Sequence, residues 1–353
     1  MRIINLKHFL RSQIYLILVI ISGNYIFSGC KYITLENQSS SLTEIKLAVL
    51  NVYSTGLIVA ADRSNEIDPS VNCFAQAGLK PIIIKRSKGP EVVDALLGNS
   101  AEVGTLAVTP QALQAVQGNQ LVAFSTIQTT DKDIKVIGYR SAGIKSGSSL
   151  KGKQVGYVGG TYGEIFLSRY LAKHEMKKSD VSLVTSSPAQ LRDLFVSNSL
   201  DALVLWEPFI QDILDNPATK KDNIFIDVDR SIYIGKINLL ARPEFIQNKP
   251  KEAEKLVRAL LCGEQLIQKY PDKARQSIEK WLDRKPNTLT NVFDKSTFKV
   301  DLNKTELLSD LKEESKWALE SVFSGKGNIP KDFTPFVNDS IMKAASSEQV
   351  RVK

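Results

Sequence analysis

The segment 154–163 has the residue types and spacing of a site that could hold an anion. It predicts a strand ending at Val158, a tight turn through Gly160, and a helix that begins after Thr161. Backbone N–H groups and the macrodipole at a helix N-terminus attract anions, and the Thr161 hydroxyl adds a donor. Val158 stands where a dinucleotide-binding motif needs glycine, and the sequence holds no G-K-[ST] phosphate loop. An ordinary strand-to-helix turn with Thr161 as its N-cap explains the segment equally well.

A second candidate is the segment 201–209, where an apolar strand delivers Trp206 and Glu207 to its C-terminal end and Pro208 starts the next helix. In open α/β sheets, ligands bind outside the carboxyl ends of the strands. Trp206 is therefore a candidate to stack on a ligand, and Glu207 is a candidate to accept a hydrogen bond or hold a cation. The alternative is that Trp206 belongs to the core and Glu207 complements the helix dipole.

Two further segments also follow predicted strands. After the first strand, the candidate ligand-binding residues are Asn51, Tyr53, Ser54, Thr55 and Gly56. The segment 104–110 adds Thr105. Each segment is also compatible with plain turn chemistry. The informative feature is that all four segments occupy the same position, at the end of a strand.

Alternating apolar runs and amphipathic segments supply the elements that position these residues. The predicted strands are 45–50, 81–85, 103–107, 121–125, 135–139, 154–158, 181–184 and 202–206. The predicted helices are 90–97, 110–116 with Thr109 as N-cap, 162–173, 188–196 and 208–214. Further on, 224–228 and 232–240 look extended, 250–281 and 305–323 look helical, and 283–301 looks irregular. Strands that alternate with helices predict an α/β fold with parallel strands.

The N-terminus predicts the compartment. Positive residues before an apolar run at 14–21 are typical of a secretory signal, and the run is shorter than the roughly 20 residues that cross a bilayer. Ser28 and Gly29 precede Cys30, which resembles a bacterial lipobox whose cysteine becomes lipidated. We therefore expect a signal peptide at 1–29, a lipid-anchored linker at 30–43 and an extracytoplasmic location. An uncleaved membrane anchor is the alternative.

Composition excludes several function classes. The 353 residues carry a net charge of +8, but the basic clusters have no interleaved aromatic residues, so nucleic acid is not an expected partner. The sequence has only two histidines, His8 and His174, so we do not expect a histidine-based metal site or nucleophilic chemistry that depends on histidine. Cys73 and Cys262 can form at most one bridge with each other. No metal or organic cofactor is expected.

An ordered set of motifs resembles the solute-binding proteins of ABC transporters in the nitrate, sulfonate and taurine group, which includes binders of thiamine precursors. The matching segments are 95–98, 101–105, 150–156, 160–161 and 200–208. The resemblance implies a two-lobed periplasmic-binding-protein (type II) fold, in which each lobe is a sheet flanked by helices. Lobe 1 would begin with 44–128, lobe 2 would occupy 129–227, and 228–353 would return to lobe 1 with C-terminal helices.

The resemblance also implies a function without bond chemistry. A monomer would close on a small solute and present it to a membrane permease and its ATPase. Tyr53 to Gly56 and Thr105 would contribute from lobe 1, and Gly160, Thr161, Trp206 and Glu207 from lobe 2. If Glu207 faces the ligand, like-charge repulsion argues against a bare anion such as nitrate and favours an aminosulfonate or an amine-bearing heterocycle. The alternatives are an enzyme of the same fold that acts on a small heterocycle, and a sensor or surface lipoprotein without a permease.

Overall fold

The computed structural model describes residues 41–293 and 296–346. The predicted signal peptide, the predicted lipidation site at Cys30 and most of the predicted linker lie outside these residues. Within the described ranges, no helix is long and apolar enough to cross a membrane.

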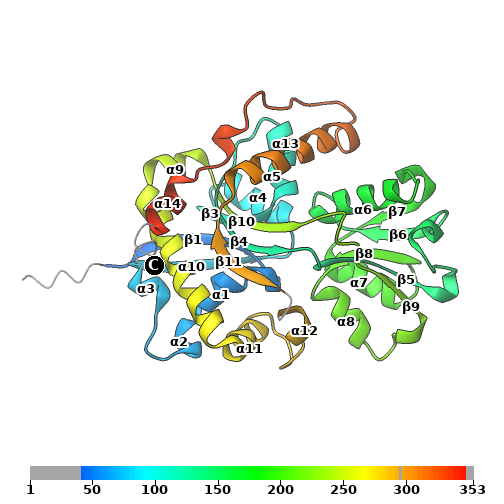
Figure 1. The fold of residues 1–353 in the computed structure, drawn as a ribbon, viewed down its shortest axis with the longest axis horizontal. Helices are drawn as coiled ribbons and strands as arrows, with labels where there is room; N and C mark the ends of the chain where they lie inside the picture. Colours follow the sequence, from blue (N-terminus) through cyan, green and yellow to red (C-terminus); the bar gives the residue numbers. More distant parts are fainter. Residues whose placement is uncertain (1–40, 294–295, 347–353) are drawn as a thin grey trace, which may run out of the picture. The chain divides into compact units, whose positions relative to one another are not determined.

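The larger of two sheets has six strands in the order β11-β4-β10-β3-β1-β2 (Figure 1). These strands are β1 (Thr43–Leu50), β2 (Leu79–Arg86), β3 (Val103–Ala107), β4 (Val122–Thr130), β10 (Gly235–Ala241) and β11 (Thr297–Asp301). β1 is parallel to β2 and β3, whereas β10 runs antiparallel to β3 and β4. β11 runs antiparallel to β4 at the edge of the sheet.

The smaller sheet has five strands in the order β7-β6-β8-β5-β9. They are β5 (Ile134–Tyr139), β6 (Gln154–Tyr157), β7 (Ser182–Thr185), β8 (Ala202–Trp206) and β9 (Ile224–Asp227). β6 is parallel to β7 and β8, and β5 is antiparallel to β8 and β9. We call the part of the molecule built on the six-stranded sheet lobe 1, and the part built on the five-stranded sheet lobe 2.

Helices flank both sheets (Figure 1). Lobe 1 carries α1 (Gly56–Asp62), α2 (Ser64–Ile67), α3 (Cys73–Gln76), α4 (Gly89–Leu97), α5 (Val108–Val116), α9 (Pro243–Asn248), α10 (Pro250–Lys269), α11 (Pro271–Trp281), α12 (Thr290–Phe293), α13 (Lys304–Ser321) and α14 (Ser340–Ser346). Lobe 2 carries α6 (Tyr162–Lys173), α7 (Pro188–Val196) and α8 (Phe209–Asp215). The predicted two-lobed α/β fold, with a sheet flanked by helices in each lobe, is confirmed.

The chain passes from the larger sheet to the smaller one at residues 131–133, and it returns at residues 228–234. We call these segments the first and second crossovers. Each is short and joins strands of different sheets, so it is the natural place for a hinge. Side chains on both crossovers are therefore held close to the boundary between the lobes.

Local signals in the sequence explain several helix ends. In α7, Ser187 and Gln190 form the predicted capping box ahead of Pro188. The prediction for α5 was wrong, because this helix begins at Val108 with Ala107 as its N-cap. Thr109 lies inside the first turn, and its buried hydroxyl donates to the Glu314 carboxylate instead.

Two other sequence predictions needed correction. The helical stretch 250–281 is divided into α10 and α11 at Tyr270, because Pro271 has no N–H to continue the helix. The segment predicted to be irregular contains β11, whose Phe298 and Val300 are buried while Thr297 and Lys299 are exposed. This alternation is the signature of an edge strand with one covered face.

A disulfide bond joins Cys73, on α3, to Cys262, on α10. The sequence left this pairing open. The bond links two segments of lobe 1 that are 189 residues apart in the chain. It therefore ties the start of lobe 1 to the part of the chain that returns from lobe 2.

Candidate functional site

A cavity of about 360 Å³ opens between the lobes. Lobe 1 contributes Tyr53 and the segment around α12, and lobe 2 contributes Lys135, Glu207 and Gln211. The crossovers complete the wall. The full lining is Tyr53, Thr130, Lys132, Lys135, Glu207, Gln211, Val228, Arg230, Asn291, Val292 and Ser296. Because both lobes and both crossovers line it, the shape of this cavity depends on how the lobes are held together.

Positive charge dominates the lining. It includes three cations, on Lys132, Lys135 and Arg230, and one carboxylate, on Glu207. Glu207 is only 3% exposed and forms an ion pair with Lys135. Its other oxygen accepts the backbone N–H of Gln211 at 3.0 Å. The charge of Glu207 is therefore compensated, which removes the reason to expect that it repels an anion.

Lys132 and Arg230 are the remaining cations of this wall. Among the residues that the structure describes, neither forms an ion pair with a carboxylate. Lys132 lies on the first crossover and Arg230 on the second. Two uncompensated cations on opposite crossovers favour a negatively charged or strongly accepting group between them. Tyr53, Thr130 and Ser296 add polar groups to the same cavity.

A buried aromatic cluster adjoins this cavity, since Asp133 accepts the backbone N–H of Glu207, which lines it. The Tyr162 hydroxyl donates to Oδ2 of Asp133 at 2.7 Å, and the ring of Tyr162 lies 4.9 Å from that of Trp206, centroid to centroid. Burial raises the pKa of Asp133 to about 6, and burial raises the pKa values of Tyr53 and Tyr162 well above 10. Both tyrosines thus remain protonated donors at neutral pH. The sequence suggested that Trp206 either belongs to the core or faces a ligand. It is buried, and it also lines a small cavity at the boundary between the lobes.

Residues of both lobes, among them Tyr162 and Trp206, line a second cavity of about 20 Å³. Ser54, Thr161 and Trp206 are the predicted site residues that line it. The volume of this cavity is close to the volume that a single water molecule needs. The lobes touch here, since a Cβ atom placed on Gly160 would lie 3.2 Å from Cγ of Pro90. Gly160 also has a φ of +70°, which favours glycine.

The turn at Gly160 and Thr161 is an N-cap whose donors are already engaged. The Thr161 hydroxyl donates to the carbonyl of Val158 at 2.7 Å and accepts from the N–H of Gly163 at 3.2 Å. The N–H of Gly160 donates to Oε2 of Glu164 at 3.0 Å. Lys178 lies 3.0 Å from the other carboxylate oxygen of Glu164. The chain thus places its own carboxylate at the position where the sequence suggested a bound anion.

The remaining predicted residues act within lobe 1. The Thr55 hydroxyl donates to the carbonyls of Leu50 and Val52, and Oγ1 of Thr105 accepts the N–H of Leu50 at 2.9 Å. Gly56 begins α1 beneath the ring of Phe298. Oδ1 of Asn51 is buried and has no hydrogen-bond partner among the described residues. The Thr55 and Thr105 hydroxyls thus fix the end of β1, and none of these four residues lines either of the two cavities described above.

Sequence reasoning missed Lys132, Asp133, Lys135, Arg230 and Glu164. Four of these lie on or next to the crossovers, and the charged run 131–135 was the available signal. Within the described residues, no group of three or more His, Cys, Asp or Glu side chains could hold a metal ion.

The sequence is similar to parts of several known proteins, three of which are described here. A Brucella abortus (strain 2308) protein described as a binding protein is 25% identical over 199 residues, which cover 56% of this chain and 60% of that protein. An Escherichia coli (strain K12) protein described as an aliphatic sulfonates-binding protein is 26% identical over 157 residues, covering 44% and 48%. The 4-amino-5-hydroxymethyl-2-methylpyrimidine phosphate synthase of Uromyces fabae is 23% identical over 201 residues, covering 54% and 58%. The matches thus span about half to three fifths of these curated relatives.

Solved structures share the fold. The periplasmic aliphatic sulphonate binding protein SsuA from Escherichia coli superposes with a TM-score of 0.68 at 16% identity, covering 81% of this chain and 90% of that one. The periplasmic nitrate-binding protein NrtA from Synechocystis PCC 6803 gives 0.65 at 14% identity, covering 87% and 89%. A family model described as NMT1/THI5 like matches residues 51–274, more than half of the chain. The resemblance found in the sequence is confirmed: the chain belongs to the NMT1/THI5-like family and has the fold of periplasmic binding proteins.

Proposed function

We propose that this protein is a lipid-anchored, extracytoplasmic solute-binding protein that captures a small polar solute with an acidic group and delivers it to an ABC permease. The observation that carries the proposal is the 360 Å³ cavity whose wall comes from both lobes and both crossovers. A ligand in such a cavity contacts both lobes at once, so its binding energy favours one lobe arrangement over others. A partner that reads that arrangement would recognise the loaded protein.

The charge of the cavity supports an anionic group on the solute. Lys132 and Arg230 face a space in which Lys135 already balances Glu207. Sulfonates, taurine and nitrate carry such a group, and the relatives whose names mention sulfonate or nitrate are consistent with this class. We propose that Tyr53, Lys132, Glu207 and Arg230, which line the larger cavity, contact the ligand. Trp206, which lines the smaller cavity, would support this site from the lobe boundary.

A second candidate function is an enzyme that acts on a small heterocycle, which the relative named as a pyrimidine phosphate synthase favours. Such an enzyme needs a nucleophile or base in the cavity. His174 packs beside Gly147 and Tyr170 inside lobe 2, and Cys73 and Cys262 are bonded to each other. The groups that the sequence offered for this role are therefore occupied elsewhere, which favours binding without bond chemistry.

The Cys73–Cys262 disulfide supports an extracytoplasmic location, because disulfides persist in oxidising compartments. Anchoring through Cys30 and delivery to a permease are part of the proposal. Metabolic labelling with a palmitate analogue would test the anchor, with Cys30→Ala as the control that must lose the label. Genes for a permease and an ATPase beside this one would support transport over a sensor role.

A thermal-shift panel tests the proposed ligand class. The full chain in detergent would be screened against methanesulfonate, taurine, nitrate, sulfate, a hydroxymethylpyrimidine and simple amines. A ligand at a hundredfold excess over its Kd stabilises the folded state by about 2.7 kcal/mol. A saturable upward shift with an anion supports the proposal. Shifts only with amines or with the pyrimidine would contradict the anionic class.

A further inference from the structure

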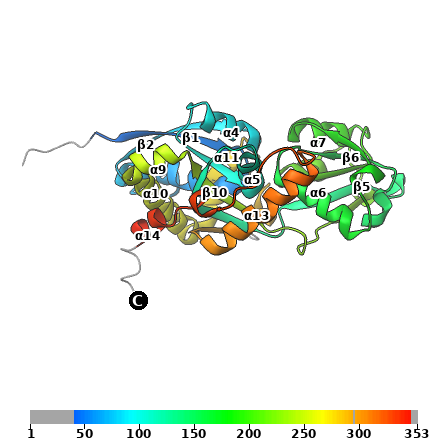
Figure 2. The same cartoon turned by 90° about the horizontal axis from the view of Figure 1, so that it is seen from above.

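Helix α13 belongs to lobe 1 but reaches lobe 2. Its inner face packs on α5 through Ala318, which clusters with Leu113 and Val116. Seen from above, α13 crosses α5 and continues to the side of α6 (Figure 2). A helix fixed to one lobe and adjacent to the other is placed to control how the two lobes meet.

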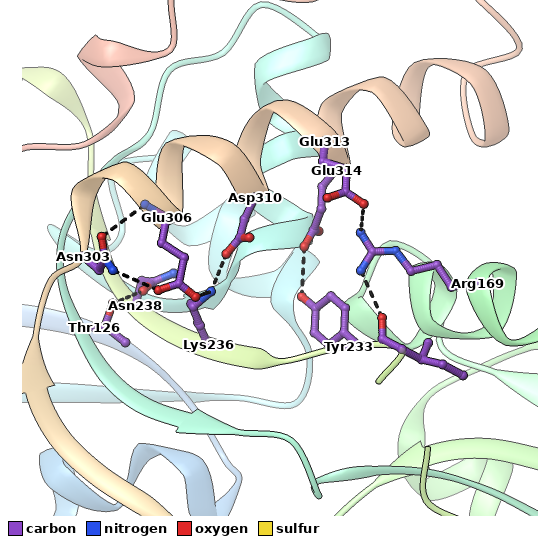
Figure 3. A network of polar contacts seen from close by, with 11 residues as sticks. Thr126, Arg169, Tyr233, Lys236, Asn238, Asn303, Glu306, Asp310, Glu313 and Glu314 are labelled. Carbon is purple, nitrogen blue, oxygen red and sulfur yellow. Dashed lines mark hydrogen bonds and ion pairs between the residues drawn. The ribbon is translucent and has the colours of Figure 1, made fainter. Parts of the chain in front are cut away.

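Four carboxylates lie along one face of α13. Glu306, Asp310, Glu313 and Glu314 recur at the three- to four-residue spacing that aligns side chains on a helix. Figure 3 shows them above the second crossover and the start of β10. Lys236, on β10, pairs with Glu306 at 2.7 Å and with Asp310 at 2.5 Å. These two pairs stay within lobe 1.

The next turn of α13 engages the second crossover. Oε1 of Glu314 accepts the hydroxyl of Tyr233 at 3.1 Å, and Oε2 accepts the hydroxyl of Thr109. Both Glu314 and Tyr233 are buried. The crossover is thus fastened to α13 and to α5 at one point, immediately before β10.

Arg169, on α6 of lobe 2, closes this network across the lobe boundary. Its Nη2 lies 2.7 Å from Oε1 of Glu313, and its Nη1 donates to the carbonyl of Ile232 at 3.3 Å. The guanidinium centre lies 5.6 Å from the centroid of the Tyr233 ring. One planar cation therefore contacts α13 by its charge and the crossover by a hydrogen bond and a cation–π contact.

A second contact from lobe 2 meets the same helix. Nζ of Lys178 lies 5.7 Å from the centroid of the Trp317 ring, one turn beyond Glu313. The same ammonium pairs with Glu164, which accepts the N–H of Gly160 where that turn meets Pro90. Contacts at α13 are thus linked to the place where the turn at Gly160 meets Pro90 of lobe 1.

We propose that Arg169 is a positioning residue for solute capture: by binding Glu313 and the second crossover, it holds lobe 2 in the arrangement in which both lobes line the cavity. The pair is not deeply buried, since the Arg169 side chain is 29% exposed and that of Glu313 is 67% exposed. It therefore contributes little to folding. It acts on the lobe equilibrium, where small free-energy differences change the populations. The role in capture rests on the proposed function, but the lobe arrangement can be measured without a solute.

The test is single-molecule energy transfer between the lobes. Ketone-bearing amino acids would replace Asp94 on α4 and Ala189 on α7, both exposed, so that fluorophores attach without using cysteine. The full chain in detergent would be measured without added solute. We expect Arg169→Gln to increase the low-transfer, wider-spaced population by about 1.4- to fivefold, the range for an exposed ion pair. The melting temperature should stay close to that of the parent.

We call the contact of Arg169 with Glu313 and the second crossover the latch. Three variants separate the loss of this latch from a general structural effect. Glu306→Gln removes a carboxylate of the same row whose partner Lys236 lies in lobe 1, and it should leave the energy-transfer distribution unchanged. Arg169→Lys keeps the charge without the planar group, so its energy-transfer distribution should lie between those of the parent and of Arg169→Gln. The charge swap of Arg169→Glu with Glu313→Arg should restore more than either single change. Restoration requires direct pairing.

An unchanged distribution in Arg169→Gln, with a parent-like melting temperature, would overturn the proposal. So would an equal change in Glu306→Gln. Failure of the unmodified protein to bind any anion would count against the proposed function alone. Such a failure would leave the energy-transfer result, and the latch that it measures, in place.

Discussion

Oε2 of Glu164 accepts the backbone N–H of Gly160 at 3.0 Å, so the N-terminus of α6 is occupied by a carboxylate from its own first turn. Glu164 is 7% exposed and pairs with Lys178. This pair explains how a turn with the features of an anion site can be structural. It also shifts attention to the cations of the crossovers as the groups that meet a ligand.

Replacing Glu164 should destabilise lobe 2. Glu164→Gln removes the charge that complements the α6 dipole and leaves Lys178 without its carboxylate partner. We expect a loss of about 1–2 kcal/mol in the free energy of unfolding, measured with urea. Glu320→Gln changes an exposed carboxylate on α13 and serves as the matched control. Equal stabilities of the two variants would refute the structural role of Glu164.

Replacing Glu207 and replacing Lys135 should change the affinity for an anion in opposite directions. Glu207→Gln leaves the Lys135 charge uncompensated in the cavity, so affinity for methanesulfonate should rise. Lys135→Gln leaves the buried Glu207 carboxylate unpaired, so affinity should fall and stability should drop by about 3–5 kcal/mol. Titration calorimetry and urea unfolding measure the two effects. Weaker methanesulfonate binding in Glu207→Gln would contradict the assignment of Glu207 as a compensated charge.

The disulfide should contribute strongly to the stability of lobe 1. Replacing both Cys73 and Cys262 by alanine should lower the free energy of unfolding by about 2–5 kcal/mol, since the bond closes a long loop of the unfolded chain. Dithiothreitol should lower the melting temperature of the parent to that of the double variant. A double variant that is itself sensitive to dithiothreitol would show that the reductant acts elsewhere.

Stability should fall as the pH rises through neutrality because of Glu314. Burial raises the pKa of Glu314 from 4.5 to about 7, although hydrogen bonds from Thr109 and Tyr233 and the charge of Arg169 lower it, and Asp310 raises it. The folded protein holds the proton more tightly than the unfolded chain. The resulting stabilisation is complete below about pH 4 and is lost as the pH rises through about 7.

Glu314→Gln should remove this dependence. The free energy of unfolding of the variant, relative to the parent, should increase by up to about 3 kcal/mol between pH 5 and pH 8. Urea unfolding at several pH values measures the difference, and Glu320→Gln should give a curve parallel to the parent. Burial also raises the pKa of Asp133, to about 6, so Asp133 makes the stability of both proteins fall as the pH rises. A constant difference between Glu314→Gln and the parent would contradict a raised pKa of Glu314.

Much of the fold could be predicted because its signals are local. The apolar run of β8 and the flanking glycine and proline signals of α4 define those elements within a few residues of their observed ends. β11 was missed because an edge strand with one exposed face has only a short, weak alternation. Thr109 has the composition of an N-cap, but its hydroxyl is claimed by Glu314, 205 residues away in the chain.

The candidate site was harder to predict because it depends on distant pairings. Tyr53, Trp206 and Glu207 could be found, since each lies at or just beyond the end of a strand. Lys132 and Arg230 face one cavity only because two crossovers far apart in sequence meet there. The charge of Glu207 could not be interpreted without its partner, because the sequence does not reveal that Lys135, on the neighbouring strand β5, forms an ion pair with it.

The most direct test of the account is calorimetric titration of methanesulfonate and taurine into the full chain and into the double variant Lys132→Gln with Arg230→Gln. We expect saturable binding to the parent and a Kd at least about tenfold weaker in the double variant, since charge-assisted hydrogen bonds each contribute about 1.5–3 kcal/mol. Lys145→Gln, an exposed change in lobe 2, should bind like the parent. Equal affinity of the double variant and the parent would contradict the claim that the cavity between the lobes captures an anionic solute.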